Sequence, residues 1–189
     1  SNTILFDIQP GQKDGVIKLM EDNKFKVNQV VPIITCRLSE VKGKAVEILQ
    51  NDTTDKIPNW ALTREYRVTY RDSLHHSEEL IKGELHRKQP GKDSIWVTIS
   101  EGMEENLQVS VGDSLVFDIQ GVPLKVHIAG LRKVDWPKDP PNFIFVFPPG
   151  VLENAPQIFV TSTRIDDQQR ANVFQQQLVM QFPNVSLID

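Results

Sequence analysis

Histidine and glutamate side chains crowd together at His75-His76-Ser77-Glu78-Glu79, the richest group of potential metal ligands and acid–base groups in the sequence. Imidazole and carboxylate are donor types that Zn²⁺ takes, and imidazole also exchanges protons near neutral pH. We interpret the segment as a solvated, polar connection at a strand, where adjacent histidines point to opposite faces. The sequence therefore predicts no metal site and no catalytic residues here, although a small hydrolase using residues 75–79 stays an alternative.

A second pair of carboxylates, Asp166-Asp167, has the composition of an acid–base pair. It comes directly before a helical pattern, where acidic side chains accept hydrogen bonds from the free N–H groups of the first turn. We therefore expect helix capping. The sequence contains no G-x-S-x-G, H-E-x-x-H or G-x-G-x-x-G motif, so it indicates no nucleophile elbow, zinc protease site or dinucleotide site.

The segment from Leu131 to Phe143 combines a tryptophan, three prolines and charges of both signs. Proline fixes φ, so the loop is stiff and presents Trp136 at a small entropic cost. It supplies the candidate partner- or ligand-binding residues Arg132, Asp135, Trp136, Asn142 and Phe143. The alternative is a rigid loop that only closes a β-rich domain over its core. A carbohydrate- or peptide-binding module would need Trp136 and Phe143 exposed on one face.

The composition limits the other functions. The 189 residues suffice for one domain or two small ones, and the net charge of −4 without a strong basic run gives no support for nucleic-acid binding. Cys36 is the single cysteine, which excludes an internal disulfide and a cysteine-based zinc site, and its apolar neighbours predict burial. No apolar run approaches the roughly 20 residues that a membrane span needs.

Both ends of the chain show a strand–helix–strand pattern. Ile4, Phe6 and Ile8 alternate as in a strand, and Val16, Leu19 and Met20 have the spacing of a short amphipathic helix. A second strand is predicted at residues 30–37. Near the other end, the patterns predict a strand at 158–163, a helix stopped by Pro183-Asn184, and a strand at 185–188. The helical face carries Ala171, Phe174, Leu178 and Phe182.

The two halves together predict an α+β fold, a split β-α-β (ferredoxin-like) sandwich with an inserted, mostly-β domain between its halves. We assign residues 1–50 and 156–189 to the sandwich and residues 51–155 to the insertion. Within the insertion, strands are predicted at 65–70, 79–85, 95–99 and 142–147, and a short helix at 103–107. Gln120-Gly121 is predicted to turn a hairpin between two alternating runs, at residues 115–119 and 124–128.

This topology predicts where the chain ends lie. The first and last strands of a split β-α-β sandwich place both termini at one edge of the sheet, and the insertion projects from the other. The chain begins and ends in strand patterns without polar tails, so we expect it to be a segment of a longer protein. Such a module is typical of an extramembrane loop between two transmembrane helices.

The sequence also resembles a known family. The segments VTISEGMEENLQVSVGDSLVFDIQG, VHIAGLRKVDW and NFIFVFPPGVL, between Ser94 and Leu152, together with TSTRIDD and QFPNVSLID, are similar to the extracytoplasmic domain of FtsX-like ABC transporter permeases of the MacB/LolC class. The YbbP-like branch fits best. The similarity is good over residues 94–189 and looser before, where Arg64 to Val68 depart from the expected strand.

The resemblance implies a porter-like α/β part with both chain ends and an inserted Sabre-like β part. It implies a non-catalytic periplasmic domain of a bacterial inner-membrane permease, which relays ATP-driven movement of transmembrane helices to a protein partner or to lipoprotein, lipid or peptide cargo. A separate cytoplasmic ATPase would bind ATP, and this domain would need no cofactor. A second permease domain is a further expected partner. A freestanding carbohydrate- or peptide-binding module remains the alternative besides the hydrolase.

Overall fold

The computed structural model describes residues 2–54, 57–85 and 94–189. The chain forms two compact units, Ser1–Ile33 with Gln157–Asp189, and Ile34–Pro156. It is a mixed, mostly β structure with five α-helices among the described residues. None of the described helices is both long enough and apolar enough to cross a membrane.

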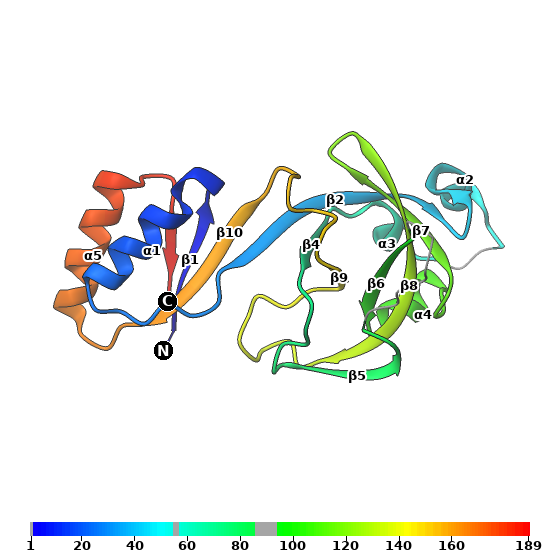
Figure 1. Ribbon diagram of the computed structural model, residues 1–189. Helices are drawn as coiled ribbons and strands as arrows, with labels where there is room; N and C mark the ends of the chain where they lie inside the picture. Colours follow the sequence, from blue (N-terminus) through cyan, green and yellow to red (C-terminus); the bar gives the residue numbers. More distant parts are fainter. Residues whose placement is uncertain (1, 55–56, 86–93) are drawn as a thin grey trace. The chain divides into compact units, whose positions relative to one another are not determined.

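The first unit is a four-stranded antiparallel sheet with two helices on one side (Figure 1). Its strands follow the order β11-β1-β10-β2, and its connectivity is β-α-β followed by β-α-β, as the sequence patterns predict. The elements are β1 (Asn2–Ile8), the 3-10 helix η1 (Pro10–Gln12), α1 (Lys13–Asp22), the start of β2 (Val31–Val41), β10 (Ile158–Arg164), α5 (Gln168–Gln181) and β11 (Ser186–Ile188).

The helices of the first unit form because each has one apolar face to bury. Helix α1 buries Val16, Leu19 and Met20, and α5 buries Phe174 and Leu178. The Phe174 ring meets Phe25 edge to face, with 5.2 Å between ring centroids. Both helices therefore pack into the same apolar core, together with Leu5 and Ile8 of β1.

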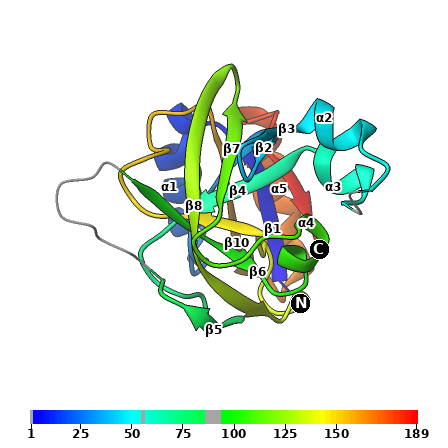
Figure 2. The ribbon, with the colours of Figure 1, turned by 90° about the vertical axis from the view of Figure 1, so that its right-hand side faces the viewer.

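The second unit is built around a closed six-stranded barrel, in which neighbouring strands pair around the ring β2-β4-β9-β6-β8-β7 and back to β2. The pairs β4–β9 and β6–β8 are parallel and the other pairs in the ring are antiparallel. Figure 2 shows the strands of this unit in a view turned by 90° from that of Figure 1. Its further elements are β3 (Lys44–Ala45), α2 (Val46–Asn51), α3 (Asn59–Thr63), β4 (Tyr66–Tyr70), β5 (Glu78–Gly83), β6 (Ile95–Ser100), α4 (Met103–Leu107), β7 (Ser114–Ile119), β8 (Val122–Val134) and β9 (Phe145–Phe147).

Aromatic rings fill the barrel. Phe145 meets Tyr66 and Phe117 at centroid distances of 5.4 Å and 5.0 Å, both edge to face. The thiol of Cys36 lies in the same core, as predicted, and burial raises its pKa to about 12. The predicted hairpin is also present: Gln120 and Gly121 turn between β7 and β8 with φ of 51° and 98°, the positive values that a tight primed turn requires.

Strand β2 continues from the first unit into the second. Its residues 31–33 pair with β10, and from Ile34 onward it pairs with β4 and then β7. Residues 34–50, which the sequence patterns group with the sandwich, therefore lie in the barrel unit. The predicted strand at 142–147 is shorter, Phe145–Phe147, and the carbonyls of Phe143 and Ile144 just before it accept hydrogen bonds from the Arg132 side chain.

Candidate functional site

Arg132 of β8 is the centre of a buried polar network in the second unit. Its side chain is fully buried and its guanidinium forms an ion pair with Glu78. Its Nε donates to the Thr98 hydroxyl over 2.7 Å, and one terminal nitrogen donates to the carbonyls of Phe143 and Ile144 over 2.9 Å and 2.7 Å. Arg132 therefore fastens β5, β6 and the start of β9 to β8.

Glu78 is the acidic member of this network, and its side chain is also fully buried. Burial alone would raise the pKa of its carboxyl. The Arg132 charge, the His75 backbone N–H and Arg71 outweigh that effect, so the pKa lies below its ordinary value. The same carboxylate accepts a hydrogen bond from the His75 N–H over 2.9 Å, which fixes the turn that precedes β5.

The loop between β8 and β9 is held by Asn142. Its amide nitrogen donates to the carbonyls of Trp136 and Lys138, each over 2.9 Å, and its amide oxygen accepts from the Ser77 hydroxyl over 2.6 Å. The backbone N–H of Asp135 donates to the Ser77 carbonyl over 2.9 Å. Ser77 and Asn142 thus tie this loop to the turn before β5.

The five predicted binding residues divide into two groups. Arg132 and Phe143 are buried, with 0% and 3% of their surface exposed, and Asn142 is half-buried. These three hold the loop in place. Asp135 and Trp136 are exposed, Trp136 by 46%, and are available to a partner. Because Phe143 is buried, Trp136 and Phe143 do not form the joint exposed aromatic face that the carbohydrate- or peptide-binding alternative requires.

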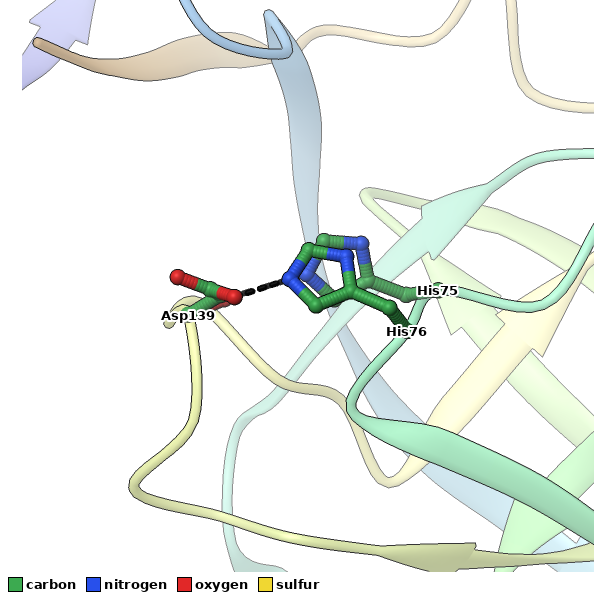
Figure 3. A group of neighbouring side chains, drawn as sticks. All are labelled: His75, His76 and Asp139. Carbon is green, nitrogen blue, oxygen red and sulfur yellow. Dashed lines mark hydrogen bonds and ion pairs between the residues drawn. The ribbon is translucent and has the colours of Figure 1, made fainter.

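Two histidines and an aspartate meet beside this loop. The prediction that His75 and His76 point to opposite faces of a strand is wrong, because both precede the start of β5 and lie in a turn. Their ring centroids are 4.2 Å apart. The His76 Nε2 forms an ion-pair contact with the Asp139 carboxylate, as Figure 3 shows. Glu79 is not part of this group.

The surroundings of this cluster shift the pKa values of His75 and Asp139. Burial lowers the pKa of His75, and the neighbouring His76 lowers it further. The hydrogen bond from His76 lowers the pKa of the Asp139 carboxyl. At neutral pH, the lowered pKa of His75 favours its neutral imidazole, which has a lone pair free for a proton or a metal ion.

Sequence reasoning did not identify Asp139, Ser77 or Thr98 as members of these sites. Asp139 lies 63 positions from His76 in the chain, so no local spacing rule connects them. The sequence shows that Asp139 lies in the same proline-rich loop as Trp136. The pairing of the preceding strand β8 with β5, which follows the two histidines, becomes visible only in the structure.

Comparison with known proteins shows that the chain is a domain related to an ABC transporter permease. The relative is described as the uncharacterized ABC transporter permease YbbP of Escherichia coli (strain K12). It is 28% identical over 188 residues, which cover 100% of this chain and 21% of the relative. The chain therefore spans about a fifth of the length of the relative it matches. The resemblance to permeases drawn from the sequence motifs is confirmed at this level.

No protein-family model matches the chain. Among solved structures, a crystal structure described as a domain of a presumed permease protein from Porphyromonas gingivalis is similar. It has a TM-score of 0.43 and 15% sequence identity, over 99% of this chain and 89% of that chain.

Proposed function

We propose that this chain is the extracytoplasmic domain of an ABC transporter permease and that it relays ATP-driven movement of transmembrane helices to a bound partner or cargo. The observation that carries the proposal is the relation to YbbP over the whole chain. A resemblance in part of the chain would be compatible with a shared module in unrelated proteins. A match that covers 100% of the chain instead favours one common domain.

The geometry of the first unit supports this placement. Strands β1 and β11 are antiparallel neighbours, with Ile4 opposite Ile188, and the Thr3 hydroxyl donates to the Asp189 carboxylate over 2.9 Å. The two ends of the chain therefore lie side by side (Figure 1). A domain that connects two neighbouring transmembrane helices needs such an arrangement.

In this proposal the domain is non-catalytic and needs no cofactor of its own to relay the movement. A separate cytoplasmic ATPase subunit hydrolyses ATP, and the domain lies in the periplasm of a bacterial inner-membrane protein. Its partners are a second permease domain and a periplasmic protein or a lipid-type cargo. The motion reaches them through the sandwich, which carries both chain ends, and through β2, which continues from the sandwich into the barrel.

The location is tested by labelling a cysteine in the intact membrane protein. Val122, which is 61% exposed at the start of β8, is replaced by cysteine, and spheroplasts are treated with a membrane-impermeant maleimide. We expect labelling before lysis. The parent protein is the control, because Cys36 is 4% exposed and should not react in the folded domain. Labelling of Val122→Cys only after lysis would contradict the proposal.

We further propose that Trp136 contacts the partner. A photo-crosslinking amino acid at position 136 of the intact protein should give a discrete adduct in cells, because the hydrogen bonds of Asn142 hold the surrounding loop in one conformation. Trp60 of α3, with 51% exposure, is the matched control position and should give none. Trp136→Ala should leave the melting temperature nearly unchanged. A large fall in that temperature, without an adduct at 136, would favour a purely structural loop.

A further inference from the structure

Three side chains from two separate segments converge on one point in the second unit. His75 and His76 belong to the turn before β5, and Asp139 belongs to the loop between β8 and β9. One potential ligand atom from each residue lies within 4.8 Å of those of the other two. Figure 3 shows the His76 ring directed at the carboxylate and the His75 ring beside it. The His75 Nε2 is 3.3 Å from the backbone carbonyl oxygen of Asp139.

The donor set has a defined preference among metal ions. Two imidazole nitrogens and one carboxylate oxygen match the three-ligand zinc sites that keep a fourth position open. Ca²⁺ and Mg²⁺ are disfavoured because they require mostly oxygen ligands. Ligands at about 2.1 Å from a tetrahedral ion lie roughly 3.4 Å from one another. The three ligand atoms lie within 4.8 Å of one another, and His76 and Asp139 are exposed side chains that are free to turn toward a common ion.

Hydrogen bonds behind the cluster hold both segments in position. Ser77 follows the two histidines and bonds to Asn142, whose amide in turn fixes the carbonyl of Lys138 next to Asp139. The buried Glu78 carboxylate accepts the His75 N–H. Partners of this kind, one step removed from the ligands, orient metal ligands and reduce the entropy lost on binding. Arg71, whose positive charge lowers the pKa of His75, forms an ion pair with the same glutamate, Glu78.

We propose that His75, His76 and Asp139 form a site for a divalent transition-metal ion, with Zn²⁺ as the ion bound and one coordination position left open to water or to a group of a partner. The site connects the turn before β5 to the loop that carries Trp136. Metal binding would therefore stiffen this exposed loop. The proposal does not depend on the permease assignment, since it rests only on the geometry of the second unit.

The experiment titrates the chelator-treated chain with Zn²⁺ by calorimetry and with Co²⁺ by visible absorption. We expect one saturable site with a Kd of about 1 μM or tighter and the absorption of a four- or five-coordinate Co²⁺ complex. Asp139→Asn and His76→Ala should each weaken Zn²⁺ binding by at least about 10-fold. Zn²⁺ at about 100 times Kd should raise the melting temperature by roughly 5–10 °C.

Two matched variants are the controls. Asp135→Asn removes a carboxylate from the same loop. His127→Ala removes a histidine outside the cluster, whose ring lies against Trp96 of β6. Neither residue belongs to the cluster, so both variants should bind Zn²⁺ like the parent chain. The proposal is overturned if the parent shows no saturable binding up to about 100 μM Zn²⁺. It is also overturned if binding persists in the double variant His75→Ala/His76→Ala, because another site would then hold the ion.

Discussion

At the scale of single residues, the Arg132–Glu78 pair shows how a charged group comes to lie inside a small barrel. Both side chains are fully buried, which is tolerated because the guanidinium has partners on three strands or their ends. A buried pair of this kind adds little net stability, but removal of one partner leaves an uncompensated charge. Arg132, selected from the sequence as a binding residue, is therefore a structural residue of the loop that presents Trp136.

Replacing this arginine tests the network. Arg132→Met should lower the free energy of unfolding by about 3–5 kcal/mol, because Glu78 is left buried beside Arg71 alone. Urea denaturation measures the change. Glu78→Leu/Arg132→Met should recover part of the loss, since the fully buried carboxylate is then removed as well. The recovery is incomplete because Arg71, which is 19% exposed, loses its ion pair with Glu78. If Arg132→Met does not fold, Arg132→Lys, which keeps the charge, should show a smaller loss. A cost below about 1 kcal/mol for Arg132→Met would mean that the pair is not buried in solution.

At the scale of elements, the helices and turns that depend on nearby residues in the sequence were predicted well. Helix α4 occupies Met103–Leu107 as expected, and the β7–β8 hairpin turns at Gln120 and Gly121 because that turn needs positive φ. Elements with weak local signals were missed: α2 and α3 are short and rely on the barrel for an apolar surface. The proximity of Asp139 to His75 and His76 was missed for a related reason, since it depends on the register of β5 against β8.

Helix α5 offers a test of the capping prediction, which is confirmed by the structure. The Asp167 carboxylate accepts hydrogen bonds from the N–H groups of Gln169 and Arg170, whereas Asp166 forms an ion pair with the exposed Arg164. Asp167→Ala should therefore cost about 1 kcal/mol of stability, and Asp166→Ala should cost less than about 0.5 kcal/mol. Chemical denaturation of both variants gives the comparison. Equal losses would contradict the assigned cap.

The pairing of β5 with β8 depends on a close approach at Gly130. A Cβ at this position would lie 2.6 Å from the carbonyl oxygens of Lys82 and Glu84, which are backbone atoms and cannot move aside cheaply. Gly130→Ala should therefore separate the end of β5 from β8, with a loss of roughly 1–3 kcal/mol and faster amide hydrogen exchange in β5. Gly11→Ala is the control, because a Cβ there meets nothing within 4 Å. Unchanged amide hydrogen exchange in β5 of Gly130→Ala would refute the register of β5 against β8.

At the scale of the whole molecule, the sequence indicated two units and the β-α-β connectivity of the first. It placed the junction after residue 50, whereas the two units divide within β2, between Ile33 and Ile34. Hydrophobic periodicity identifies a strand but does not reveal which neighbours the strand will have. Strand β2 serves both units: residues 31–33 pair with β10, and later residues close the barrel between β4 and β7. Closure of the barrel depends on pairing between strands that are far apart in the sequence, so it cannot be predicted from a short window of residues.

This shared strand leads to a prediction about fragments. A fragment of residues 34–156 contains all six strands of the ring, since the part of β2 that pairs with β4 and β7 begins at Ile34. A fragment of residues 51–155, the boundaries suggested by the sequence patterns, lacks β2. Its barrel would be open, with unpaired edges on β4 and β7 and with buried side chains such as Phe117 exposed to water.

We therefore expect the longer fragment to give dispersed amide resonances and one cooperative thermal transition, and the shorter one to aggregate or to unfold without cooperativity. The difference follows from β2 alone if a third fragment, residues 42–156, behaves like the shorter one, because it restores β3 and α2 but not the missing strand. A well-folded 51–155 fragment would show that the barrel closes without β2, and the division of the chain at Ile34 would then have to move toward the original sequence boundary.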